Sequence, residues 1–116
     1  MTGQNLLKIN GMNTSRNKYD AIEKIIFENE LRIVNIEIRS EIDKMLVFLN
    51  TQHILAIPLS NFKTLKKAGN KDLNKFELIA NGTGVRWPRL DEDLSLKGFL
   101  KDALQQMVRE KQYVID

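Results

Sequence analysis

The stretch that most limits the fold of this chain is residues 81–95, which read Asn-Gly-Thr-Gly-Val-Arg-Trp-Pro-Arg-Leu-Asp-Glu-Asp-Leu-Ser. Asn81-Gly82 predicts a tight hairpin turn, because both residue types adopt positive φ at low cost. The turn joins two expected strands, Phe76–Ala80 and Val85–Trp87. Pro88 cannot donate a ladder hydrogen bond, so we expect the chain to leave the sheet there.

A long amphipathic helix is expected directly after this stretch, over residues 95–112. Ser95 is the natural N-cap, and the carboxylates of Asp91–Asp93 are expected to stabilise the positive end of the helix dipole. We favour burial of its whole apolar stripe against one sheet face; an uncovered stripe would instead mark a partner or a second copy. The stripe follows helical spacing through Leu96, Phe99, Leu100, Ala103, Leu104, Met107 and Val108.

The N-terminal part of the chain predicts one helix after a flexible arm. Residues 1–14 lack hydrophobic periodicity and are rich in Asn and Gly, which is typical of an extended or frayed arm. Residues 16–29 place their apolar side chains at helical spacing, and Ser15 or Thr14 is the expected cap. The run Ile25-Ile26-Phe27 is also compatible with the start of a strand.

Three further strands are expected at Leu31–Arg39, Lys44–Leu49 and His53–Ile57, joined as an antiparallel meander. A short helix follows from Ser60, its expected cap, to about Ala68, and Gly69-Asn70 is expected to end it. The 116 residues therefore predict a single α+β domain. Its antiparallel meander of about five strands would pack against the long C-terminal helix, with a short middle helix and an N-terminal helix.

Composition excludes several classes of protein. The chain has no Cys, which rules out a disulfide framework, a thiolate nucleophile and Cys-ligated metal sites. Nothing resembles a signal peptide or a membrane-spanning run, so we expect a cytoplasmic protein without membrane contact. We expect no cofactor.

The net charge of +3 is concentrated in residues 61–75, where five lysines face Asp72 alone. Such a patch is typical of a solvated face, and this is the interpretation that we favour. Its alternative is direct nucleic-acid binding. The lysines concerned are Lys63, Lys66, Lys67, Lys71 and Lys75.

Two features carry a weak signal for catalysis. Asp91, Glu92 and Asp93 are three adjacent carboxylates, and a metal-dependent enzyme built around them is an alternative function. Adjacent side chains do not point the same way in a regular element, and no further ligands cluster in the sequence, so we expect no metal site. His53 is the only His and lies in an apolar strand, which favours a structural position over a catalytic one.

The residues around the only Trp form the candidate partner-binding corner. Arg86 and Arg89 flank Trp87-Pro88, and this combination suits protein or phosphate recognition. A core position for Trp87 is the interpretation that we favour. The corner consists of Arg86, Trp87, Arg89, Asp91, Glu92 and Asp93.

Residues 82–100 resemble the signature of a bacterial family, domain of unknown function 2442. The resemblance rests on Gly82-Thr83-Gly84-Val85-Arg86-Trp87-Pro88 and on the following Arg89-Leu90-Asp91-Glu92-Asp93-Leu94-Ser95, then Gly98-Phe99-Leu100. Pro58-Leu59, Phe62, Leu65 and Ala68 match its middle segment, so the likeness covers about residues 31–100. Arg86 stands where relatives often have His.

The resemblance implies an α+β fold and no established catalysis. Some relatives carry a DNA-binding helix-turn-helix after this module, and others are encoded beside a small partner protein, as in toxin–antitoxin pairs. It therefore implies a small non-enzymatic regulatory module that binds proteins, either antitoxin-like or transcription-associated. The expected partner is the product of a neighbouring gene or a second copy of the chain.

Overall fold

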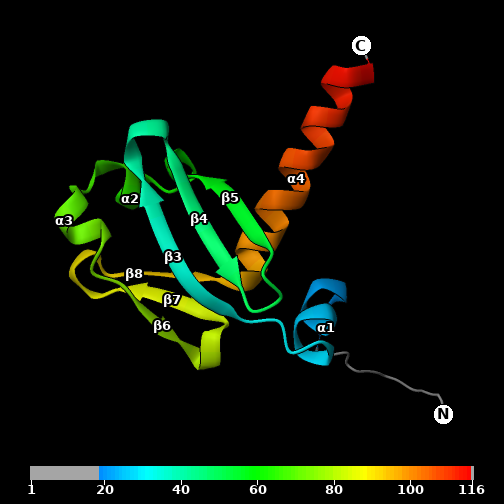
Figure 1. Cartoon of the computed structure of the whole chain (residues 1–116), viewed down its shortest axis with the longest axis horizontal. Coiled ribbons are helices and arrows are strands. Elements are labelled where there is room, and N and C mark those ends of the chain that lie inside the picture. Colours follow the sequence, from blue (N-terminus) through cyan, green and yellow to red (C-terminus); the bar gives the residue numbers. More distant parts are fainter. Residues whose placement is uncertain (1–18, 116) are drawn as a thin grey trace.

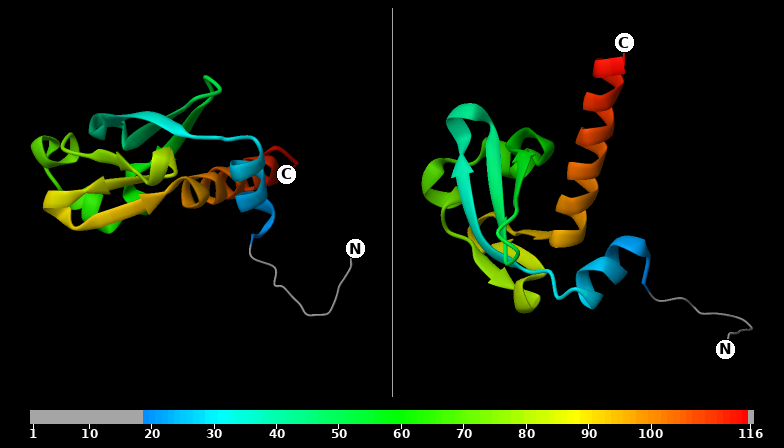
Figure 2. Two further views of the ribbon diagram at one scale, coloured as in Figure 1. Left: turned by 90° about the horizontal axis from the view of Figure 1, so that it is seen from below. Right: turned by 45° about the vertical axis from the view of Figure 1, so that its right-hand side comes forward.

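The computed structural model describes residues 19–115, and for residues 110–115 it describes the backbone alone. The described strands form two antiparallel three-stranded sheets, ordered β3-β4-β5 and β6-β7-β8. Figure 2 (left) shows the two sheets as separate layers. The α+β class is confirmed, and the single meander of about five strands is corrected to two sheets with one additional strand.

The first sheet forms where the sequence predicts alternating strands. Its strands are β3 (Ile33–Arg39), β4 (Lys44–Leu49) and β5 (Ile54–Pro58). Met45, Val47 and Leu49 alternate as buried side chains along the central strand β4. Because successive strand residues point to opposite faces, this alternation directs one face of the sheet into the core.

The second sheet contains β6 (Glu77–Ile79), β7 (Gly84–Trp87) and β8 (Glu92–Ser95). The turn expected at Asn81-Gly82 is confirmed, with φ of 56° and 81° at these two residues. The chain leaves strand β7 at Pro88 as expected, but it then returns to the sheet, which was not expected. Pro88 begins a 3₁₀ turn, and Asp91 then adopts a left-handed φ of 52°, which returns the chain to pair with β7 as β8.

The same turn geometry occurs between β3 and β4. Residues Ser40–Ile42 form a 3₁₀ turn, and Asp43 follows with a left-handed φ of 56°. Asp tolerates this conformation better than most residues with a Cβ, because its short polar side chain bonds locally. A turn that ends in Asp therefore connects β3 to β4 in the first sheet, and a second such turn connects β7 to β8 in the second sheet.

The helices lie at the ends of the two layers. Helix α1 (Ala21–Glu28) precedes β3, while α2 (Lys63–Lys67) and α3 (Asn70–Leu73) connect the sheets. Helix α4 (Leu96–Ile115) leaves the end of β8 and projects past β5, as Figure 1 shows. None of the helices in the described range 19–115 is both long and apolar enough to cross a lipid bilayer.

Three expected helix boundaries are changed. The predicted caps Ser15 and Thr14 lie outside the described residues, and Asp20 caps α1 in a reciprocal arrangement with Glu23. Ser60 does not cap the middle helix, because its hydroxyl donates to Asp43 Oδ2 at 2.7 Å and α2 begins at Lys63. Gly69 does not adopt a left-handed conformation, with φ of −79°, and the chain continues into α3.

One hydrophobic core joins both sheets to the first turns of α4. Val47 and Ile57 from the first sheet are fully buried, as are Val85 and Trp87 from the second sheet. Phe99 of α4 reaches the same cluster at 1% exposure. A side chain of this size stabilises the fold by about 1.5–3 kcal/mol when it is fully buried.

Candidate functional site

The predicted corner around Trp87 is divided by the sheet into a buried part and a surface part. Trp87 is 0% exposed, which confirms its core position. Its indole Nε1–H donates to the carbonyl oxygen of Leu73 at 2.8 Å, and its ring lies 6.1 Å from that of Phe76. Trp87 therefore anchors α3 to the second sheet and is not available to a partner.

Arg86 points away from the core and pairs across the strands with Asp93. The guanidinium Nε lies 2.9 Å from Asp93 Oδ1, and Nη2 lies 3.2 Å from Oδ2. This bidentate hydrogen bonding holds the pKa of the Asp93 carboxyl below its usual range. Glu77 is the β6 residue that pairs with Arg86 in the ladder, so Arg86 is flanked by carboxylates on both neighbouring strands.

Arg89 and the remaining acidic residues do not converge with this pair. Arg89 Nε forms an ion pair with Asp72 Oδ1 of α3 at 2.9 Å. Asp91 occupies the left-handed turn, and Glu92 pairs in the β8 ladder opposite Trp87. The expectation that Asp91–Asp93 lie at the start of the helix is therefore wrong, since Glu92 and Asp93 belong to β8 and α4 begins at Leu96.

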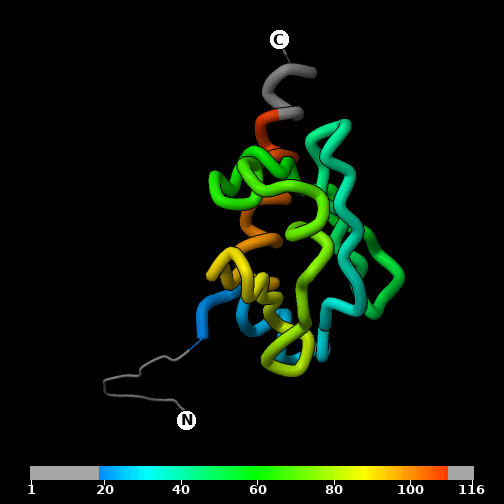
Figure 3. Tube along the Cα trace, turned by 90° about the vertical axis from the view of Figure 1, so that its left-hand side faces the viewer, coloured from blue at the N-terminus to red at the C-terminus, as the bar shows by residue number. Residues whose placement is uncertain are grey.

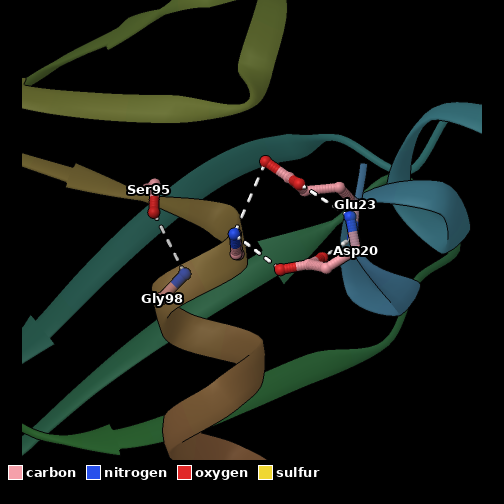
Figure 4. Close-up of polar contacts among 5 residues, drawn as sticks. Asp20, Glu23, Ser95 and Gly98 are labelled. Carbon is pink, nitrogen blue, oxygen red and sulfur yellow. Dashed lines mark hydrogen bonds and ion pairs between the residues drawn. The ribbon is translucent and has the colours of Figure 1, made fainter. Parts of the chain in front are cut away.

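The start of α4 nevertheless has the N-cap that the sequence predicts. Ser95 Oγ accepts a hydrogen bond from the backbone N–H of Gly98 at 3.0 Å (Figure 4). Next to this cap, Lys97 Nζ lies 2.7 Å from Asp20 Oδ2 and 3.5 Å from Glu23 Oε2, which joins α4 to the cap of α1. The ammonium group holds the pKa of Asp20 below its usual range.

The predicted basic patch lies on α2, α3 and the segment before β6. All five lysines are exposed, and the green α2–α3 segment that carries most of them faces the viewer in Figure 3. Lys66 Nζ pairs with Asp43 Oδ1 at 3.1 Å. Within the described part of the chain, the other four form no ion pair with a carboxylate. They are Lys63, Lys67, Lys71 and Lys75.

Neither weak signal for catalysis is strengthened by the structure. Among the side chains that the structure describes, no three from His, Asp or Glu are grouped so that they could hold a metal ion. His53 is exposed and lies in a shallow groove between β5 and α4, beside Met107. This groove brings together no second group suited to general acid–base chemistry.

A pocket that the sequence did not predict lies beside Asp93. It has a volume of about 550 Å³ and is formed by the β6–β7 turn, β8 and the first turns of α4. Asp102 and Gly98 of α4 belong to its lining, together with Asp93. The signal in the sequence that points to it is Gly98, a glycine in the first turn of a strongly periodic helix.

Exposed apolar residues continue along α4 beyond the sheets. Leu104, Met107 and Val108 are 50%, 60% and 57% exposed, whereas Leu96 and Phe99 are buried. The favoured expectation that one sheet face buries the whole stripe is therefore wrong beyond Ala103. The helix is longer than the face that it covers, as Figure 1 shows.

Solved structures show the same fold in proteins whose function is also unknown. A protein of unknown function from Rhodospirillum rubrum is 29% identical, with a TM-score of 0.56 over 63% of this chain and 88% of its own. An uncharacterised protein from Chromobacterium violaceum is 25% identical, with a TM-score of 0.59 over 79% of this chain and 87% of its own. Among curated proteins, no sequence matches the chain.

The family resemblance in residues 82–100 is confirmed across a larger region. The sequence profile described as "Protein of unknown function (DUF2442)" matches residues 33–104. The match begins with the first residue of β3 and ends in the middle of α4, so it includes both sheets and the covered part of that helix. The chain belongs to the DUF2442 family of proteins of unknown function.

Proposed function

We propose that this protein is a non-enzymatic binding module that contacts another protein through the uncovered part of α4. The observation that carries the proposal is the exposure of Leu104, Met107 and Val108 on a helix whose earlier apolar residues are buried. An exposed apolar patch on a small domain commonly marks an interaction surface, because its burial against a partner is favourable. A regulatory role, antitoxin-like or transcription-associated, rests on the family resemblance alone.

The arrangement of the fold supports this use of α4. The helix is anchored at its start by the Ser95 cap and by Lys97, whose ammonium group pairs with both Asp20 and Glu23. A helix held at one end presents its free half as a preformed surface, which lowers the entropy lost on binding. An amphipathic helix that docks in a partner's groove is a common mode of protein recognition.

The test compares two variants of the exposed segment. Leu104→Lys combined with Val108→Lys places charges on the apolar patch, whereas Gln105→Lys adds one to a neighbouring exposed position. Each purified protein is measured by light scattering for self-association and by calorimetry against the product of the neighbouring gene. We expect the double variant to lose association by roughly tenfold or more and the control to retain it. Absence of both kinds of association in the wild type, or equal binding by all three proteins, would overturn the proposal.

Nucleic-acid binding is the second candidate function. It is favoured by one observation, the four lysines of the α2–α3 region that form no ion pair in the described structure. Lys63 and Lys67 lie on α2, and Lys71 lies on α3, so the charges are concentrated on one part of the surface. A fluorescence titration with duplex and single-stranded oligonucleotides at increasing salt tests it. Affinity that falls steeply with salt supports the candidate, and no binding at low salt excludes it.

A further inference from the structure

The pocket beside Asp93 has the size and walls of a site for a small molecule. Its volume of about 550 Å³ lies within the range of roughly 300–1,000 Å³ that is usual for ligand sites. Phe62, Ile79, Leu94 and Phe99 provide apolar walls from three separate parts of the chain. Its lining includes residues of the second sheet and of α4, but not Leu104, Met107 or Val108.

Gly98 lies in the wall of the pocket, in the first turn of α4. A Cβ at this position would lie 3.3 Å from Ser95 Oγ, the atom that accepts the capping hydrogen bond from the Gly98 N–H. Gly84, by comparison, is more closely surrounded, because a Cβ there would lie 3.1 Å from Ile79 Cγ1 and 3.4 Å from the carbonyl oxygen of Leu94. At Gly98, the missing side chain leaves open space in the wall of the pocket.

The charges at the pocket favour a cationic ligand. Asp93 is already neutralised by the bidentate hydrogen bonds from Arg86. Asp102 is half-buried and, among the described residues, forms no ion pair or side-chain hydrogen bond. It lies four residues after Gly98, so the two share a face of α4 and the glycine leaves room beside the carboxylate. The partly exposed aromatic ring of Phe62 also favours a cation over an anion.

We propose that this pocket binds a small organic cation, a primary amine carried on an aromatic or branched alkyl body. Asp102 accepts hydrogen bonds from the ammonium group, and the apolar walls bury the body of the ligand. Gly98 provides the space in which the ammonium group reaches the carboxylate. The inference does not rest on the proposed role of α4 in protein binding, since neither Leu104 nor Val108 belongs to this pocket.

The experiment is a titration of the full chain observed by two-dimensional amide NMR. Phenethylamine is the probe, and phenylacetate and phenylethanol are the anionic and neutral controls with the same ring. We expect saturable shifts of the Gly84, Gly98 and Asp102 amides with phenethylamine in the millimolar range, and weaker or no shifts with the two controls.

Three variants separate the contributions to binding. Asp102→Asn keeps the shape of the side chain, and we expect it to remove the preference for phenethylamine over phenylethanol. Gly98→Ala narrows the pocket, and we expect affinity to fall about tenfold while the thermal midpoint stays unchanged or rises. Gly69→Ala is the matched control, because a Cβ there meets nothing within 4 Å.

Clear outcomes would overturn the inference. One is the absence of saturable shifts around the pocket with phenethylamine, and another is equal shifts with phenylacetate. Unchanged affinity in both Gly98→Ala and Asp102→Asn, with both variants folded, would place the binding elsewhere on the molecule. Loss of association through α4 in the Leu104 and Val108 variants would leave this titration unchanged, so the two proposals fail independently.

Discussion

At the scale of single residues, Gly82 shows how close backbone approach selects one amino acid. Its φ is 81°, and a Cβ would lie 3.0 Å from the carbonyl oxygen of Ile33 and 3.1 Å from Arg32 Cβ. Both the backbone conformation and the neighbouring strand therefore exclude a larger residue. The turn between β6 and β7 contacts the start of β3 through this position.

We predict that Gly82→Ala lowers the free energy of unfolding by about 1–3 kcal/mol, because it adds left-handed strain and a steric contact. The measurement is urea unfolding followed by circular dichroism. Gly69→Ala is the control, with a φ of −79° and an open surrounding, and it should cost far less. Equal losses in the two variants would contradict this account of the turn.

Trp87 gives a second prediction at this scale. Its indole N–H is buried and donates to the carbonyl oxygen of Leu73 at 2.8 Å. Trp87→Phe leaves that carbonyl without its partner and removes part of a fully buried ring, so we expect a loss of about 1–3 kcal/mol from the polar group, with a further loss from the cavity. Hydrogen exchange of the indole proton provides an independent readout. Fast exchange of this proton in the native wild type would contradict the buried hydrogen bond.

At the scale of secondary-structure elements, α1 depends on α4 for its position. Lys97 reaches from the first turn of α4 to both acidic residues of the α1 cap, Asp20 and Glu23. The contact is electrostatically favourable, because the carboxylates lie at the positive end of the α1 dipole and the ammonium group further neutralises their charge. Figure 4 shows the two acidic residues facing the start of α4.

We predict that Lys97→Met reduces the hydrogen-exchange protection of the α1 amides and leaves the protection of β4 unchanged. The reason is that the substitution removes the charge between the two helices and keeps a side chain of similar length. Lys24→Met is the control, because Lys24 lies on α1 itself and forms no ion pair with α4 among the described residues. Loss of protection in both variants would indicate a general effect of charge removal on α1.

At the scale of the whole molecule, three carboxylates with a lowered pKa each join two different elements or turns of the fold. Asp20 meets Lys97, Asp43 meets Ser60 and Lys66, and Asp93 meets Arg86. The hydrogen bond from Lys97 lowers the pKa of Asp20, the one from Ser60 lowers the pKa of Asp43, and the one from Arg86 lowers the pKa of Asp93. Each group therefore binds its proton less tightly in the folded state than in the unfolded state.

Because the three pKa values are lowered by folding, the stability of the protein is expected to fall in acid. The stabilisation is present above the ordinary Asp pKa of 3.8 and is lost as pH falls through the lower folded values. We predict that the urea midpoint falls between pH 5 and pH 3, roughly the window in which Asp side chains titrate. The combined Asp20→Asn, Asp43→Asn and Asp93→Asn variant should show a flatter profile. An acid-induced loss of equal size in this variant would contradict the assignment.

The elements that could be predicted from the sequence are those that local chemistry specifies. Strand β4 is predicted by its alternating apolar residues. The turn at Asn81-Gly82 is predicted because Asn and Gly adopt positive φ at low cost, and the start of α4 is predicted by the Ser95 cap. Strand β8 could not be predicted in this way. Its acidic residues suit the start of a helix equally well, and only the left-handed turn at Asp91 and pairing with β7 decide between the two.

The features of the candidate sites also fall into those that the sequence predicts and those that it does not. Burial of Trp87 was predictable, since a large aromatic next to a strand end commonly lies in the core. The separation of Arg86 from Arg89 was not predictable, because their partners Asp93 and Asp72 lie on different elements. The pocket around Gly98 also depends on contacts between the β6–β7 turn and α4, which no local pattern encodes.

The sequence by itself determined the strands of the first sheet, the hairpin turn of the second and the long amphipathic helix. These features depend on interactions between residues that are close in the chain. The tertiary structure alone decided that there are two sheets, that α4 extends beyond the surface that it covers, and that Asp102 faces a pocket without a counter-charge among the described residues. These outcomes depend on which distant segments meet, and pairing energies over long separations are not visible in any short stretch of sequence.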